Sequence, residues 1–413
     1  MPELIVDRLF DAATVEDPYP YYATLREHEP VHQVPGTSAF LVTNAELIHE
    51  VVSDPDTYSS HTASFLYLSP DGEVGVRPAG AGDEFEMGIP GVLATADPPD
   101  HGRQRKLLTR HFSSSALARR EPEFRTLVDA VLDTHIDVGS VEWMAAVAEP
   151  LPMVMVARLL GLPDSDAPTL KEYGFAGVEQ INGFASEERC DEIRDRLYDL
   201  GPIGESYTQA LKGTGPGDDT VIGACAQAVQ SGALNDLEAL SILMLVTIAG
   251  GESTTSLLGT GAFLLARNEA LQSRLRGQPE LISRFVEEAC RFDPPFRSHY
   301  RRTTRATALN GVPIPEGAQV VLLWPSANHD PSHFSRPDEV DIERPFPRRH
   351  FGFGWGIHLC LGAPLARLEA KVAFEELLTH TSRFSVQRSE SVLRHHQSLT
   401  VRRLIALPLA LVR

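Results

Sequence analysis

The residues with the clearest chemical potential lie in one short segment near the C-terminus, residues 353–362, with the sequence FGWGIHLCLG. Cys360 follows His358 by two positions and has glycines on both sides. Glycine permits backbone angles that are closed to other residues and lets a flat ligand approach the backbone closely. Pro364 suits the first turn of a helix, which places Cys360 just before a helix N-terminus. The helix dipole and free amides there stabilise a thiolate, and a thiolate is a ready axial ligand for haem iron.

Two other roles for Cys360 are open from the residues alone. A free cysteine is most often a small buried hydrophobic residue. A nucleophilic pair of Cys360 with His358 is a second alternative, because a thiolate needs a cationic neighbour. The glycine spacing disfavours both. The other cysteines, Cys190, Cys225 and Cys290, are widely separated with no CxxC pair, which argues against a zinc site, an iron–sulfur cluster or a disulfide framework.

Residues 353–362 resemble the haem-binding signature of the cytochrome P450 family, F-G-x-G-x-[HR]-x-C-x-G, without a gap. The resemblance implies a b-type haem, iron protoporphyrin IX, held by Cys360, with electron donation from sulfur favouring O–O cleavage. It also implies that His358 contacts a haem propionate and that Phe353 and Gly354 belong to the cofactor-binding segment.

A carboxylate and a guanidinium, Glu288 and Arg291, lie three residues apart on a predicted helix, where they can pair. Alone this spacing is weak, because it usually marks a solvated helix face. Arg344 follows shortly before the cysteine segment. The resemblance implies that the three residues form a buried ionic triad, which tolerates burial only while all partners remain.

Further basic residues precede this region. His101 and Arg105 are four residues apart just inside a predicted helix start, and a generic basic surface is the alternative reading. The resemblance implies that both bind haem propionates. It implies the same role for Arg301, although the neighbouring Arg302 makes that assignment uncertain by one position.

The segment 245–255 places an acid and hydroxyls in an otherwise apolar helix. Two glycines within it disfavour an ordinary core helix and permit a local opening of the hydrogen-bond ladder. The segment is similar to the family's motif [AG]-G-x-[DE]-[TS]-T, which implies that Glu252 is the acid and Ser253 the alcohol of a proton relay. Threonine is usual at the alcohol position, so Thr254 is a neighbouring alternative, and the coupling of electrons to product is in question.

Composition limits the possible partners and location. The chain has 413 residues and a formal net charge of -19, which disfavours nucleic acid as a partner. No cationic start with an apolar block marks a secretion signal, and the most apolar run, 242–249, is too short to span a bilayer. We therefore expect a cytoplasmic protein that does not bind membranes.

The pattern along the chain predicts a mainly α protein with small β-sheets. A hairpin is expected around Pro35-Gly36, and helices from 97 to about 291. Short strands are expected beyond Pro294, including 319–324 and 399–412, the latter interrupted by Pro408. The Gly- and Pro-rich segment 59–91 is either disordered or a functional lid, and we favour the lid. We expect one domain spanning residues 1–413, and the resemblance implies the family's triangular-prism fold.

The resemblance implies a haem-thiolate monooxygenase that activates dioxygen and oxidises a hydrophobic small molecule. The chain has no flavin or nicotinamide segment of its own, so a separate ferredoxin and reductase are expected to supply electrons. A hydrogen-peroxide-dependent peroxygenase and a non-enzymatic haem sensor or binding protein are the alternatives. A basic docking patch for an acidic ferredoxin is expected at Arg103, Arg105, Lys106, Arg110, Arg348, Arg349 and Arg367.

By family position, several segments are expected to line the substrate pocket, where apolar contacts dominate. They are 59–91, 175–184, Met244, Thr247, Phe296 and 398–400. Arg297 either pairs with a substrate carboxylate or has a structural role. The sequence does not identify the substrate, the position oxidised, the particular redox partner or the oligomeric state.

Overall fold

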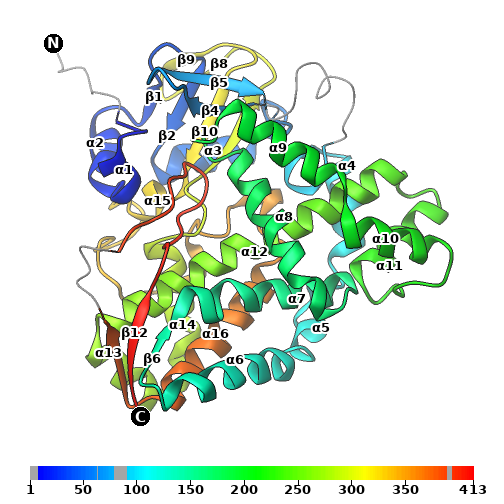
Figure 1. Ribbon diagram of the computed structural model, residues 1–413. Helices are drawn as coiled ribbons and strands as arrows, with labels where there is room; N and C mark the ends of the chain where they lie inside the picture. Colours follow the sequence, from blue (N-terminus) through cyan, green and yellow to red (C-terminus); the bar gives the residue numbers. More distant parts are fainter. Residues whose placement is uncertain (1–7, 63, 79–90, 388–392) are drawn as a thin grey trace.

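The computed structural model describes residues 8–62, 64–78, 91–387 and 393–413, and the described part is mainly helical (Figure 1). Its α-helices are α1 (Ala12–Glu16), α2 (Tyr19–His28), α3 (Ala45–Ser53), α4 (Asp100–Leu108), α5 (Ser114–Ala118), α6 (Glu121–Ile136), α7 (Pro150–Leu160), α8 (Ala167–Gln180), α9 (Glu187–Tyr198), α10 (Gly201–Leu211), α11 (Val221–Gln230), α12 (Asp236–Ala266), α13 (Glu269–Gly277), α14 (Ile282–Phe292), α15 (Trp324–Asn328) and α16 (Ala363–His380).

The strands form small sheets at two ends of the helical region. They are β1 (Val31–Gln33), β2 (Ala39–Val42), β3 (Tyr58–Ser59), β4 (Ser64–Leu68), β5 (Val74–Pro78), β6 (Ser140–Glu142), β7 (Ser298–Thr303), β8 (Thr307–Leu309), β9 (Val312–Ile314), β10 (Gln319–Leu323), β11 (Arg383–Val386) and β12 (Pro408–Val412). One sheet has the order β1-β2-β10-β7-β3 and another β11-β12-β6, while β4-β5 and β8-β9 are hairpins. The prediction of a mainly α fold with small sheets is confirmed.

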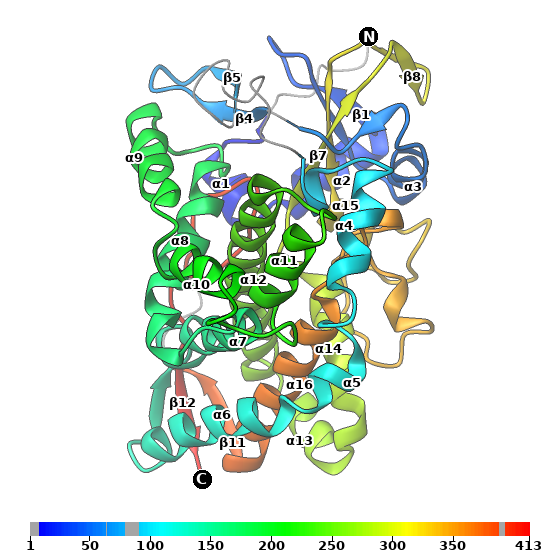
Figure 2. The ribbon, with the colours of Figure 1, turned by 90° about the vertical axis from the view of Figure 1, so that its right-hand side faces the viewer.

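Helix α12 is the central element of the helical region. It is 31 residues long and starts with a capping box, in which Asn235 and Glu238 bond each other's backbone amides. It packs against α7, α8, α11, α14 and α16, and in Figures 1 and 2 it passes through the middle of the helices. Among the described residues α12 alone is long and apolar enough to cross a membrane, but 61% of its most apolar window is buried inside the protein, as in a core helix.

The two adjacent glycines of α12, Gly250 and Gly251, allow close helix packing. A Cβ atom on Gly250 would lie 2.6 Å from Cγ2 of Val156, and one on Gly251 would lie 2.3 Å from Sδ of Met153. Both neighbours belong to α7. The helix is continuous across Gly250 and Gly251, so the local opening of the hydrogen-bond ladder that the sequence permits is not present. The glycines are explained instead by the close approach of α7, which leaves no space for a side chain at either position.

Buried arginines tie the first helix to the last part of the chain. The guanidinium of Arg297 donates to the carbonyls of Val15 (2.6 Å) and Ser398 (2.7 Å), and Arg402 donates to the carbonyl of Glu16 (2.8 Å). The Glu16 carboxylate lies 2.7 Å from Nδ1 of His395. Arg297 is 2% exposed and committed to backbone carbonyls, so the structure supports its structural role rather than a substrate contact.

The predicted hairpin around Pro35-Gly36 is confirmed. Strands β1 and β2 pair antiparallel, and Gly36 adopts a φ of 74° in the turn, a conformation that favours glycine. The predicted strand 399–412 is wrong over most of its length, because only β12 is a strand and residues before it form isolated bridges, Val401 with Phe296 and Leu404 with His395.

Candidate functional site

The cysteine segment forms a tight loop that leads directly into α16. The Cys360 amide donates to the carbonyl of Phe353 (2.9 Å), and Gly354 and Gly356 adopt φ angles of 68° and 75°, which favour glycine. Helix α16 begins at Ala363. The prediction that Cys360 lies just before a helix N-terminus is confirmed.

Cys360 is exposed in the structure, so its side chain is accessible to a ligand. Burial raises the pKa of the Cys360 thiol, while the backbone amides of Gly362 and Ala363 and the guanidinium groups of Arg367 and Arg105 lower it. A thiolate at this position therefore has amide donors and cations ready to stabilise it.

Four basic side chains, His101, Arg105, Arg301 and His358, form what we call the cationic cluster. The ring centroids of His101 and His358 are 4.2 Å apart. Burial and then the charges of Arg301, His101 and Arg105 lower the pKa of His358 to about 3. Burial also lowers the pKa of Arg301 to about 10. Burial is the main cause of both shifts, and for His358 the neighbouring positive charges add to it.

The cationic cluster has unsatisfied hydrogen-bonding capacity. Nε2 of His358 lies 2.9 Å from Oγ of Ser60, but its Nδ1 is buried and has no hydrogen-bond partner in the described part of the chain. Arg301 is 6% exposed and donates to the carbonyl of Tyr300. The nearby Asp97 is bound by Ser59 and the Ser60 amide. An anionic group beside Cys360 would supply the missing acceptors, and the two propionates of haem fit that requirement.

Glu252 in α12 is held by an arginine that the sequence did not point to. Its carboxylate lies 3.0 Å from Nε of Arg403, whose Nη1 lies 3.0 Å from Glu149. Burial raises the pKa of Glu252 although Arg403 opposes this shift. Arg403 comes from the C-terminal segment and Glu149 from the start of α7, so no local spacing could have revealed this arrangement.

The hydroxyl groups next to Glu252 differ in their surroundings. Ser253 is partly exposed and its Oγ donates to the carbonyl of Ala249 (2.8 Å), whereas Thr254 is buried. Consecutive residues on a helix point about 100° apart, so Glu252 and Ser253 lie on different sides of α12.

The predicted ionic triad is confirmed. Arg291 bonds both oxygens of Glu288 at 2.8 and 2.9 Å, and Nε of Arg344 lies 3.2 Å from the same carboxylate. Their side chains are 1%, 2% and 4% exposed for Arg291, Glu288 and Arg344. The remaining donors of Arg291 reach the carbonyls of Asn328 and Pro337.

Three of the predicted pocket segments meet in the structure. The hairpin β4-β5 contacts the loop after α8 through Leu68, whose amide donates to the carbonyl of Gly183 (2.9 Å). The amide of Leu399 donates to the carbonyl of Asn182 in the same loop (2.8 Å). Part of the predicted lid, residue 63 and residues 79–90, lies outside the described residues. The described part of 59–91 is therefore largely a β-hairpin against the α8–α9 connection.

Comparison with known proteins decides the family. A sequence model described as Cytochrome P450 matches residues 218–402. Cytochrome P450 144 of Mycobacterium tuberculosis is 36% identical over 407 residues, covering 97% of this chain and 90% of the relative. The chain belongs to the cytochrome P450 family. Proteins of this family bind haem b through a cysteine thiolate, and the chain is a cytochrome P450 monooxygenase.

Other relatives agree with this assignment. Erythromycin C-12 hydroxylase of Saccharopolyspora erythraea is 32% identical over 384 residues, 92% of this chain and 91% of the relative. The crystal structure of myxobacterial cytochrome P450 CYP267B1 in complex with myristic acid superposes with a TM-score of 0.86 at 28% identity, covering 98% of this chain and 99% of that chain. The cytochrome P450 fold expected from the sequence is thus confirmed.

A second carboxylate, that of Glu287, lies next to the triad in this cytochrome P450. It binds His350, which precedes the cysteine loop, and Arg367, which follows it. Glu287 accepts from His350 (3.1 Å) and from Nε of Arg367 (2.7 Å). The Gly352 amide donates to Nδ1 of His350 (3.0 Å), so the imidazole is neutral and donates from Nε2. Burial opposes the shift, yet the hydrogen bonds from His350 and Arg367 lower the pKa of Glu287 to about 2.

The predicted basic patch is partly neutralised. Arg367 is bound to Glu287, and Nε of Arg348 lies 3.4 Å from the same carboxylate. Arg103 pairs with Glu238, and Arg110 lies 3.6 Å from a carboxylate oxygen of Asp218. The other members of the patch are Arg105, which belongs to the cationic cluster, and Lys106 and Arg349, which are exposed.

Proposed function

We propose that this cytochrome P450 hydroxylates or otherwise oxidises a hydrophobic small molecule with dioxygen, in the cytoplasm, using electrons from a separate ferredoxin and reductase. The observation that carries the proposal is the position of Cys360, which is exposed just before the start of α16, with Arg105 of the cationic cluster close enough to act on its charge. Bound there, haem b would supply the activation of oxygen.

Cys360 would hold the iron through its thiolate, with the amides of Gly362 and Ala363 stabilising the negative charge. The cationic cluster would bind the propionates, and the free Nδ1 of His358 supports this role. Phe353 and Gly354 would flank the macrocycle on the cysteine side. The Phe353 ring is fixed from behind by the Arg367 guanidinium, 4.3 Å from the ring centroid.

Glu252 and Ser253 would supply protons for the reaction with oxygen. Glu252 holds a proton more readily than an exposed glutamate because it is buried. Ser253 Oγ, released from the carbonyl of Ala249, can accept a proton from a donor and pass its own into the site. The partial exposure of Ser253 favours it over the buried Thr254 as the relay alcohol.

A hydrophobic substrate is supported by the segments that meet near β4-β5 and by the relatives. Leu399 and Phe184, which pack in one apolar cluster with the β4-β5 strands, offer hydrocarbon contacts. The relative CYP267B1 was crystallised with myristic acid, and another relative is a hydroxylase of erythromycin. Both support a hydrophobic small molecule as the substrate class.

Replacing Glu252 by glutamine is expected to lower product formation by about 10²- to 10⁴-fold, because a positioned proton donor contributes that much. Burial raises the pKa of Glu252, so the wild-type rate should fall on the alkaline side above the usual range of a glutamate, as the carboxyl loses its proton. Glu252→Gln should lack this alkaline limb. Steady-state rates with the ferredoxin system across pH measure both effects.

The exposed Glu280→Gln variant is the matched control and should keep the wild-type rate and pH profile. Hydrogen peroxide release and the yield of product per electron measure whether Ser253→Ala uncouples electron transfer from product formation. The Ser253→Thr variant shows whether another hydroxyl at this position keeps the two coupled. A Glu252→Gln enzyme with unchanged rate and profile would contradict the relay. If the rate of turnover with hydrogen peroxide alone is the same in the wild-type enzyme and in Glu252→Gln, a peroxygenase would be favoured instead.

We also propose that an acidic ferredoxin docks over the cysteine loop, at exposed Arg348 and Arg349 and the exposed apolar Phe346 and Leu359. Reduction by such a ferredoxin should slow as ionic strength rises, since salt screens exposed charges. Arg349→Glu should slow it further, whereas Arg383→Glu should not. Arg383 follows the far end of α16, about 27 Å from its start at 1.5 Å per residue. Stopped-flow rates that are insensitive to both salt and Arg349→Glu would rule out this docking site.

A further inference from the structure

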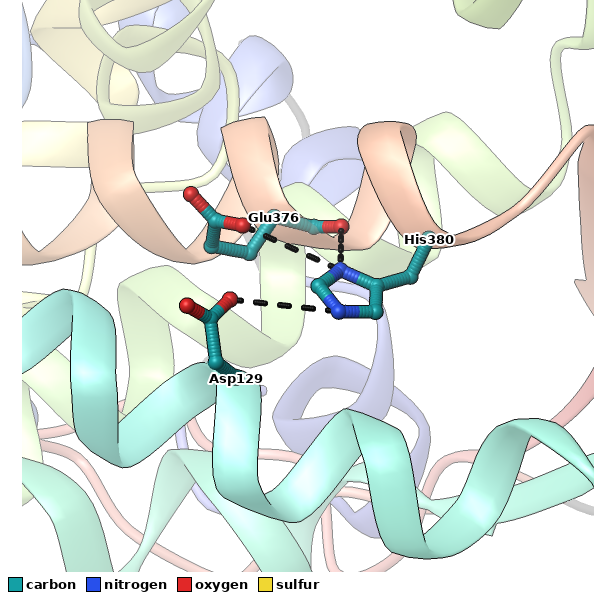
Figure 3. A group of neighbouring side chains, drawn as sticks. All are labelled: Asp129, Glu376 and His380. Atoms are coloured by element: carbon teal, nitrogen blue, oxygen red, sulfur yellow. Dashed lines mark hydrogen bonds and ion pairs between the residues drawn. The ribbon is translucent and has the colours of Figure 1, made fainter.

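We propose that a divalent cation of the zinc class binds between α6 and α16, at Asp129, Asp133, Glu376 and His380. Figure 3 shows the carboxylates of Asp129 and Glu376 converging on the imidazole of His380. The ligand atoms of these three residues all lie within 4.8 Å of one another. None of these side chains belongs to the candidate haem site.

The spacing of the four residues suits a metal held between two helices. Asp129 and Asp133 are four residues apart on α6, and Glu376 and His380 are four residues apart on α16. Residues at this spacing lie on one face of a helix, and α6 packs directly against α16. Each helix therefore contributes a pair of donors to the same interface.

The histidine is oriented for coordination. Its Nδ1 lies 3.0 Å from the carbonyl of Glu376, and donation to a backbone carbonyl fixes the tautomer that leaves Nε2 as a ligand. Nε2 lies 3.4 Å from Oδ1 of Asp133 and 3.9 Å from Oδ1 of Asp129. Two ligands of a tetrahedral zinc at about 2.0 to 2.1 Å are about 3.3 Å apart, so only small movements of Asp129 and Asp133 are needed. The Glu376 carboxylate lies 3.8 Å from Nδ1 and would have to turn toward Nε2 to become a ligand.

Negative charge exceeds positive charge around this group. The carboxylates of Glu121 and Glu375 lie beside the four residues, and the cations that neutralise them are Arg125 and Lys371. Oδ1 of Asp129 is buried and has no hydrogen-bond partner among the residues the structure describes.

Arg125 is the competitor for the site. Its guanidinium contacts Glu376 as well as Glu121 and Glu375. A cation bound at Asp129, Asp133 and His380 would share Glu376 with Arg125, which weakens coordination by that carboxylate. Removing the guanidinium should therefore strengthen metal binding.

The test is equilibrium dialysis of the haem-loaded enzyme against zinc chloride, with bound zinc counted by mass spectrometry after gel filtration. We expect one zinc per chain, an affinity at least about 10-fold lower in His380→Gln and in Asp129→Asn, since these remove ligands, and a higher affinity in Arg125→Gln. His135→Gln is the matched control: His135 also bonds a backbone carbonyl four residues back (2.8 Å) but lies two positions beyond Asp133, and its loss should leave zinc binding unchanged.

A haem spectrum and circular dichroism establish that each variant is folded. Zinc should also raise the unfolding temperature of the wild-type enzyme and of His135→Gln but not of His380→Gln, because a ligand stabilises the state that binds it. Substoichiometric zinc, or equal binding in wild type and His380→Gln, would overturn the proposal and leave the four residues as an ion-pair network alone.

Discussion

Replacing Cys360 by serine should abolish the thiolate-type absorption band of the reduced, carbon-monoxide-bound protein and reduce turnover to background. The hydroxyl of serine is not ionised near neutral pH, so it cannot supply the electron-rich axial ligand that favours O–O cleavage. The amides of Gly362 and Ala363 and the guanidinium of Arg105 would then face a neutral group. The difference spectrum of reduced protein with and without carbon monoxide measures the change.

A second cysteine provides the matched control. Cys190 lies in α9, where its thiol contacts the carbonyl of Gln180, and Cys190→Ser should keep the wild-type spectrum. A histidine-type band in the wild-type protein, or an unchanged thiolate band in Cys360→Ser, would remove Cys360 as the iron ligand.

Arg291→Met should destabilise the fold by about 3 to 5 kcal/mol, the range found when one partner of a buried ion pair is removed. The variant leaves Glu288 buried with only Arg344 opposite it. It also removes donors from the carbonyls of Asn328 and Pro337. Urea-induced unfolding followed by both haem absorbance and circular dichroism measures the loss.

The comparison for Arg291 is a surface arginine in the same region. Arg274 pairs with Glu343, and their side chains are 43% and 57% exposed. Arg274→Met should change stability by less than about 1 kcal/mol, as is usual for exposed pairs. Equal effects of the two variants would show that the buried triad does not stabilise the fold as its geometry indicates.

Local motifs made much of the candidate site predictable. Several of its residue groups lie within one loop or one helix, so their spacing in the sequence determines how they lie relative to one another. These groups are the residues around Cys360, the pair His101 and Arg105, and the pair Glu288 and Arg291. The hairpin at Gly36 is likewise local, because the turn and both strands fall within a dozen residues.

Contacts between distant segments were not predictable from spacing. Arg403 reaches Glu252 across 151 positions, and His350 reaches Glu287 across 63. The expected strand 399–412 fails for the same reason, since the backbone around Arg402 bonds elsewhere: its amide donates to the carbonyl of Pro295 (2.8 Å). The alternation of apolar and polar residues in a sequence does not show that distant backbone groups will compete with strand pairing for its hydrogen bonds.

The hydrogen bonds that Arg297 and Arg402 donate to the first helix bear on the order in which the protein folds during its synthesis. The carbonyls of Val15 and Glu16 receive hydrogen bonds from Arg297 and Arg402, which lie 282 and 386 positions later in the chain. During synthesis the first helix, α1, therefore remains without these donors until residue 297 and then residue 402 have been added. These contacts of α1 can therefore form only long after α1 itself has been synthesised, as is typical of contacts with high sequence separation.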